Sequence, residues 1–329
     1  MTNIKKIGLT ALAGTLASFS ANAGEMSVSG TAQMTISSDQ SSTSATLVDN
    51  TDKFEVNSSL VFSGSGELDN GFGVSVMSNL TGGAQTVANM QLDMGDMGVL
   101  SFDSTGGALV GITASDDILP TAYEEMWTGV SGSGINGVGS TNVIGYQNSF
   151  GMFSVSAGYS QNGSSAAESA SSGEGSHGST TDISVKAEIM DGLTIQAGYA
   201  EDGAASTSTT SEDTTSIVGH VLYSTGPVSV GFRAAETNYG TAGTASRSIE
   251  AMSIAFNVND NFAISYGVQD TEKEAISATP AVTEDVTGIS AAYTVGAASV
   301  RLMHNKSSDD NNVVGADDEQ TEVSLVLSF

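Results

Sequence analysis

The feature that most constrains this sequence is a period-two alternation of apolar and small polar residues that returns in segment after segment. In each segment the alternate positions form two sets, here called the apolar parity and the polar parity. In the first segment the apolar parity consists of Met26, Val28, Ala32, Met34 and Ile36. Successive side chains of an extended chain point to opposite faces, so the alternation predicts strands with one apolar and one polar face. About sixteen segments, the first included, show this alternation: 25–36, 53–65, 72–80, 87–94, 98–103, 141–149, 152–160, 181–190, 192–201, 214–224, 227–236, 247–258, 261–270, 283–295, 298–306 and 320–329.

Short and long connections alternate between these segments. The short ones contain Asp, Asn and Gly, which suit tight hairpin turns, and cover 68–71, 95–96, 149–152, 190–192, 225–227, 259–261 and 296–297. The long ones, rich in Ser, Thr, Gly and acids, cover 37–52, 81–86, 104–140, 161–180, 202–213, 237–246, 271–282 and 307–319. Tight turns at one end and long loops at the other are typical of an outer-membrane β-barrel. A soluble β-sandwich would show the same alternation. A soluble, secreted β-sandwich or β-solenoid is therefore the alternative to a membrane barrel.

The predicted fold is all-β: a transmembrane antiparallel β-barrel of about sixteen strands, with short periplasmic turns and long external loops. Backbone groups have no water to bond in lipid, so the sheet must close on itself. A barrel of this size is too wide for side chains to fill and leaves an aqueous channel. Lys186, Arg233 and Arg301 fall in mid-strand on the polar parity. A base facing lipid there would cost about 2–4 kcal/mol, so all three are predicted to face the watery bore.

Residues 1–23 have the pattern of a secretory signal peptide. Lys5 and Lys6 precede an apolar run over 7–19, and 21–23 form a small-x-small cleavage site. The run is too short to span a bilayer as a helix. Cleavage between Ala23 and Gly24 would leave 329 − 23 = 306 residues as one barrel domain, 24–329.

The overall composition excludes several functions. The chain has no cysteine, which removes disulfides and cysteine-based metal and nucleophile motifs. Its net charge of −28 excludes nucleic acid as an electrostatic partner. We find no catalytic motif, so no enzymatic activity and no required cofactor are predicted.

The longest connection carries paired acids, the single tryptophan and a short helical patch. We predict that residues 105–140 fold into the bore as a constricting loop. Its candidate constriction carboxylates, expected to face Lys186, Arg233 and Arg301 across the gap, are Asp116, Asp117, Glu124 and Glu125. Opposed charges would screen permeants by size and charge, and because acids outnumber bases we expect a preference for cations. The same four acids are a candidate Ca²⁺ site, and an ordinary solvated loop face is the alternative.

Four stretches carry a family resemblance. The signal ending at Ala23, the opening strand 25–30 and the closing strand 322–329 resemble Gram-negative general porins, and 116–127 resembles the pore loop of their alphaproteobacterial branch. The resemblance implies a trimeric barrel of sixteen strands in the cell outer membrane, with the third external loop inside. It implies passive diffusion of small hydrophilic solutes and ions, contact with outer-membrane lipid and lipopolysaccharide, and Ca²⁺ binding in the acidic loops. It also implies that Phe329 belongs to the signal read by the barrel-assembly machinery. A substrate-selective channel and a structural or adhesive barrel with a plugged bore are the competing functions.

Overall fold

The computed structural model describes residues 26–43, 46–105, 111, 119–131, 142–160, 179–203, 212–240, 244–276 and 280–329. The predicted signal peptide, its cleavage site at Ala23 and Gly24, and the acids Asp116 and Asp117 lie outside the described residues. Among the described residues, no helix is both long and apolar enough to cross a membrane.

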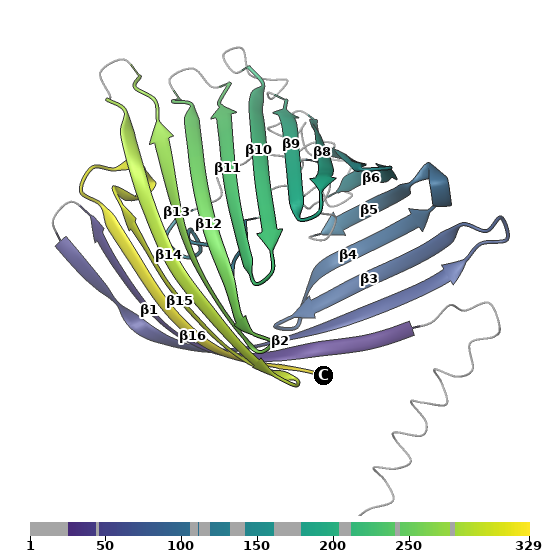
Figure 1. The fold of residues 1–329 in the computed structure, drawn as a ribbon, viewed down its shortest axis with the longest axis horizontal. Coiled ribbons are helices and arrows are strands. Elements are labelled where there is room, and N and C mark those ends of the chain that lie inside the picture. Colours follow the sequence, from purple (N-terminus) through teal and green to yellow (C-terminus); the bar gives the residue numbers. More distant parts are fainter. Residues whose placement is uncertain are drawn as a thin grey trace, which may run out of the picture.

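The described residues form sixteen antiparallel strands in one closed barrel, as predicted (Figure 1). In chain order the strands are β1 (Met26–Thr43), β2 (Thr46–Glu67), β3 (Gly73–Thr81), β4 (Ala84–Asp93), β5 (Val99–Thr105), β6 (Val143–Phe150), β7 (Phe153–Ser160), β8 (Thr180–Met190), β9 (Leu193–Asp202), β10 (Thr214–Thr225), β11 (Val228–Asn238), β12 (Arg247–Asn259), β13 (Phe262–Lys273), β14 (Val282–Val295), β15 (Ala298–Ser308) and β16 (Asp317–Ser328). Each strand pairs with its neighbours in the chain, and β1 pairs with β16 to close the ring. Short 3-10 turns cover Gly95–Met97 and Asp310–Asn312.

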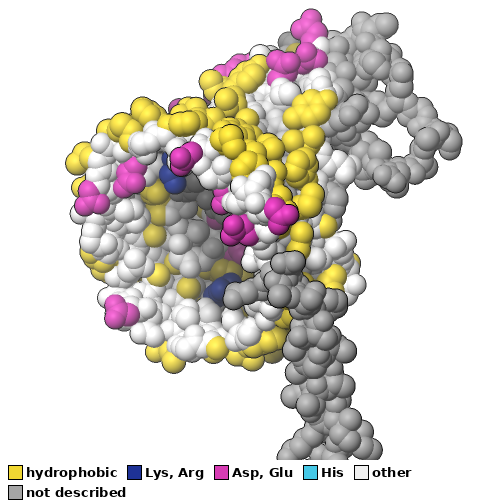
Figure 2. Space-filling view, turned by 90° about the vertical axis from the view of Figure 1, so that its right-hand side faces the viewer, with side chains coloured by type: hydrophobic (Ala, Val, Ile, Leu, Met, Phe, Trp, Pro, Cys, Tyr) yellow, Lys and Arg dark blue, Asp and Glu magenta, His cyan; other side chains and the backbone are white. Residues whose placement is uncertain are grey.

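The two parities of each strand lie on opposite faces of the wall. In β12, Met252 and Ile254 are exposed whereas Ala251 and Ser253 are buried. In β11, Phe232 is exposed beside the buried Arg233. Figure 2 shows the molecule hollowed, with hydrophobic side chains along its outer edge and charged side chains near the hollow. The apolar parity therefore forms the outer face of the barrel, and the polar parity forms the inner face.

Two predicted long loops are instead strand and tight turn, so those predictions were wrong. β1 and β2 stay paired across most of 37–52, as far as Thr43 opposite Thr46, with one irregularity between Ser37 and Asp39. β3 and β4 are joined by Gly82 and Gly83, which adopt φ of +59° and +84°. Strand pairing needs backbone hydrogen bonds and not an apolar face. A strand with both faces exposed to solvent therefore lacks the alternation of apolar and polar residues from which strands are predicted.

The seam between β1 and the end of the chain depends on a glycine. Gly30 and Phe329 exchange two backbone hydrogen bonds, each 2.9 Å long. A Cβ on Gly30 would lie 2.7 Å from two atoms of the Phe329 ring and 2.9 Å from Leu60. Only glycine leaves room for the terminal ring to lie across β1 on the outer face.

Candidate functional site

The connection between β5 and β6 is described over residues 119–131, here called the anchored segment. The amide of Thr128 donates to Glu125 O, and the amides of Val130 and Ser131 donate to Trp127 O. These bonds make one turn, so within 119–131 the segment forms a turn and not a helix. Gly129, with φ of +80°, interrupts the helical conformation. A helix this short would not offset the free energy of its own nucleation.

Hydrogen bonds attach the anchored segment to the inner face of five consecutive strands. Ser253 Oγ in β12 donates to Pro120 O at 2.9 Å. The amides of Ala122 and Tyr123 donate to Ser265 Oγ in β13 and Ser290 Oγ in β14, at 2.9 and 3.1 Å. Asn305 Nδ2 in β15 donates to both Glu125 O and Thr128 O, at 2.8 and 2.9 Å. Tyr123 Oη donates to Glu322 Oε1 in β16 at 2.6 Å. Side chains of the wall thereby satisfy backbone groups that a loop would otherwise present to water.

Apolar packing reinforces this attachment. Leu119, Met126, Trp127 and Val130 form a buried cluster with Ala251 of β12 and Val286 of β14. Glycines on the inner face let the segment approach the wall. A Cβ on Gly231 would lie 2.5 Å from Pro120 Cδ, and one on Gly288 would lie 2.6 Å from Met126 Cα.

Two of the three predicted bore cations stack on rings of the anchored segment. The Arg233 guanidinium carbon lies 5.1 Å from the Trp127 ring centroid, and Arg233 is 0% exposed. The Arg301 guanidinium carbon lies 5.2 Å from the Tyr123 ring centroid. Such cation–π contacts contribute roughly 0.5–2 kcal/mol. Both arginines therefore contact the segment directly, and the expectation that the constriction carboxylates face them across the gap stays a prediction. Lys186 is exposed on β8.

Tyr123 connects the segment to β16 through its hydroxyl group. This hydroxyl donates to Glu322 and accepts a 3.3 Å hydrogen bond from Ser324 Oγ. Burial and the bond to the Glu322 carboxylate raise the pKa of Tyr123 to about 12. The ring thus stays neutral and keeps donating to Glu322 at any physiological pH.

The two described acids of the predicted constriction lie in the anchored segment. Glu124 and Glu125 are half-buried, and the Thr128 hydroxyl donates to them at 3.4 and 3.5 Å. Among the described residues, no group of three or more His, Asp or Glu side chains is arranged to hold a metal ion. Because Asp116 and Asp117 lie outside that part of the chain, the Ca²⁺ site stays a prediction.

Sequence reasoning missed several contacts of the site. His220 and Arg233 pair directly across β10 and β11, a register that follows from the tight turn at 225–227. The anchoring residues Ser253, Ser265, Ser290 and Asn305 looked like ordinary polar positions of the inner parity. Nothing in the one-dimensional pattern distinguishes them, because the backbone groups they bond lie 133 to 180 positions away in the chain.

Comparison with families of known proteins gives one match that covers nearly the whole chain. A model described as Gram-negative porin matches residues 8–329. No curated protein matches the sequence.

Solved structures share the fold at low sequence identity. A porin superposes with a TM-score of 0.69 at 16% identity, covering 93% of this chain and 100% of its own. OmpF of Salmonella typhi, in a complex with daunomycin, gives 0.70 at 13% identity, covering 93% and 98%. OmpT, an outer membrane protein of Vibrio cholerae, gives 0.66 at 13% identity, covering 94% and 99%. At such identities the likeness concerns the fold alone.

Proposed function

Because the chain belongs to the Gram-negative porin family, we propose that its anchored segment narrows the bore and gives the channel a preference for cations. The family and the closed barrel make the protein an integral outer-membrane β-barrel. The family supports a channel for passive diffusion of small solutes, and family and fold point to a channel rather than an enzyme.

The observation that carries the narrowing is the contact of the anchored segment with six consecutive strands. Hydrogen bonds reach β12 to β16, and the Trp127–Arg233 stack extends the contact to β11. All these wall residues lie on the inner parity. A segment held against β11 to β16 reduces the cross-section of the bore on that side. The open passage then lies beside β1 to β10.

A cysteine introduced into the segment tests this placement, because the chain has none of its own. We expect Glu124→Cys channels to change conductance in planar bilayers when a charged, thiol-specific reagent is added. The outward-facing Glu201→Cys on β9 is the matched control and should not respond. An unresponsive Glu124→Cys channel, shown to be labelled by mass, would place the segment away from the passage.

The cation preference is supported by how the charges are presented. Arg233 is buried under Trp127, and Lys53 lies 3.7 Å from the Asp39 carboxylate. Glu124 and Glu125 are half-exposed. Carboxylates that face a narrow aqueous passage raise the local concentration of cations.

Reversal potentials across a KCl gradient test the preference. Glu124→Gln with Glu125→Gln should shift the reversal potential toward zero. The control, Glu201→Gln with Glu272→Gln, removes the same two charges from the outer parity and should leave it unchanged. Anion preference of the unmodified channel would refute the assignment.

The family also supports four further proposals. These are cleavage of a signal peptide after Ala23, assembly into a homotrimer, recognition of Phe329 by the barrel-assembly machinery, and contact with lipopolysaccharide. Ca²⁺ binding at the acids of the third loop is a fifth. N-terminal sequencing and cross-linking of the purified protein test the first two.

A further inference from the structure

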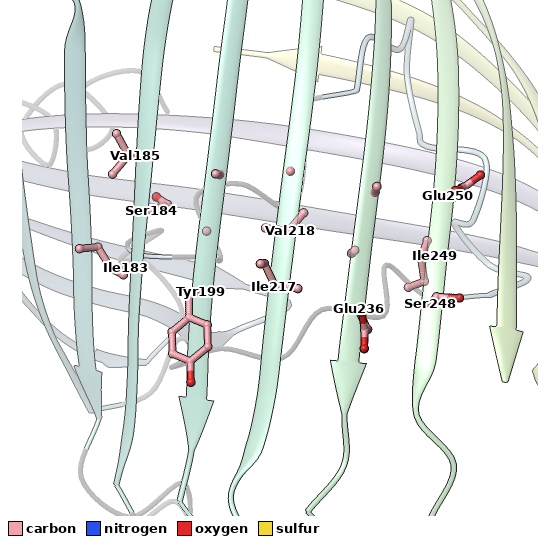
Figure 3. Close-up of a pocket in the computed structure, with 15 residues that line it drawn as sticks. Ile183, Ser184, Val185, Tyr199, Ile217, Val218, Glu236, Ser248, Ile249 and Glu250 are labelled. Carbon is pink, nitrogen blue, oxygen red and sulfur yellow. The ribbon is translucent and has the colours of Figure 1, made fainter. Parts of the chain in front are cut away.

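The outer face of the barrel carries a groove across β8 to β12 (Figure 3). Its floor consists of Ala197, Gly219 and Ala234, which are direct cross-strand neighbours on β9, β10 and β11. The groove encloses about 610 Å³. It opens outward, since its outward-parity residues Ile183 and Ile217 are 45% and 56% exposed while the adjoining inner-parity Val218 is 1% exposed.

The groove is apolar at one end and acidic at the other. Ile183, Val185, Tyr199 and Ile217 border it on β8 to β10, whereas Glu236 and Glu250 border it on β11 and β12. Figure 3 shows both carboxylates on the side opposite Ile183 and Val185. The row of cross-strand neighbours that forms the floor continues through Glu250 to Asp270 and Asp285. The outward face therefore changes from hydrocarbon-like to anionic within the length of one groove.

The chemistry of these two ends selects the ligand. The outer face of a membrane barrel contacts lipid, so hydrocarbon chains will occupy an apolar depression in it. Among the residues that the structure describes, no Lys or Arg lines the groove, and the full sequence carries a net charge of −28. An anionic headgroup would be repelled by the acidic end, whereas an ammonium group there would form charge-assisted hydrogen bonds with carboxylates.

We propose that this groove binds an amphiphile with an acyl chain and a cationic ammonium headgroup. The chain lies over Ala197, Gly219 and Ala234, and the headgroup lies between Glu236 and Glu250. The small floor residues set how deeply the chain can sit, and the two carboxylates set the headgroup selectivity. This inference rests on the barrel's location in the membrane and is independent of what passes through the bore.

Native mass spectrometry of the full-length protein in a neutral maltoside detergent tests the proposal. The probes are dodecyltrimethylammonium and dodecyl phosphate, which share the chain and differ in headgroup charge. We expect one dodecyltrimethylammonium retained per chain, with at least tenfold preference over the phosphate. Glu236→Gln with Glu250→Gln should abolish that preference, and the control Glu201→Gln with Glu272→Gln should keep it.

A second pair of variants tests the apolar floor. Gly219→Ile with Ala234→Ile fills the groove and should reduce retention at least tenfold, whereas Ala32→Ile with Ala291→Ile fills outward positions on β1 and β14 and should not. Equal retention of both probes, or unchanged retention after filling, would overturn the proposal. Stronger retention of dodecyl phosphate with added Ca²⁺ would also overturn it, in favour of an anionic lipid bridged by metal. A change of subunit number on filling would show that a second copy covers this face, and would overturn it too.

Discussion

The side chain of Asn305 controls how firmly the anchored segment is held. Its amide donates to two backbone carbonyls, Glu125 O at 2.8 Å and Thr128 O at 2.9 Å, and the residue is 1% exposed. Asn305→Asp keeps the shape but removes both donors. A buried hydrogen bond contributes about 1 kcal/mol net, so the variant loses about 2 kcal/mol of attachment. That loss corresponds to roughly 30-fold more of the detached state.

Limited proteolysis of the folded barrel measures this population. When detachment and reattachment are fast relative to cleavage, the cleavage rate follows the detached fraction. We therefore expect chymotrypsin to cut Asn305→Asp at Tyr123 or Trp127 about 30 times faster than the unmodified protein, as followed by the masses of the two fragments. Repulsion between the new carboxylate and the two carbonyl oxygens would increase this ratio further.

The control is Asn257→Asp, which makes the same change of charge at an exposed position on β12. It should leave the cleavage rate within a factor of two of the unmodified protein. Equal rates for Asn305→Asp and the unmodified protein, with the barrel folded in both, would refute the role given to these hydrogen bonds.

Three further predictions concern packing, pH and closure. Gly288→Ala places a Cβ 2.6 Å from Met126 Cα, so it should lower the free energy of unfolding, measured by urea denaturation, by about 1–3 kcal/mol. Gly219→Ala is the control and should leave that free energy unchanged, because no atom lies within 4 Å of the added Cβ. The pKa of Tyr123 is raised from 10.0 to about 12, so the stabilisation from its neutral form is complete below pH 10 and lost as pH rises toward 12. Near-UV titration should show a late-ionising tyrosine that Glu322→Gln shifts to lower pH, and no such shift would contradict the assignment. Gly30→Leu should reduce the yield of folded barrel because it occupies the place of the Phe329 ring, while Val28→Leu at an exposed outward position should not; equal yields in heat-modifiability gels would contradict this.

The wall could be predicted from the sequence because its physical rule is local. Strands such as β12 and β13 alternate in polarity along their own length and are separated by a turn with Asn and Asp, so each can be found from a short window. The rule fails where both faces of a strand are exposed to solvent. β1 and β2 continue past Ser37 as a polar ribbon that the pattern assigned to a loop.

The site could be predicted only in part. The pattern identified Glu124, Arg233 and Arg301 as notable, and the parity of both arginines was correct. It did not reveal that each arginine would stack on a ring of the segment. That outcome depends on where the segment docks, which is decided by long-range fit to inner-face glycines such as Gly231 and Gly288.

The hydrogen bonds between Gly30 and Phe329 have a consequence for biosynthesis. They belong to the seam between β1 and β16, whose paired residues run from Thr31 opposite Ser328 to Ser42 opposite Asp317, so a product that lacks β16 cannot complete the ring. A prematurely terminated polypeptide would expose two unpaired strand edges and be recognisable as defective. Closure of the cylinder thus records whether β16 has been synthesised, and degradation can act on the unpaired edges without recognising any other part of the molecule.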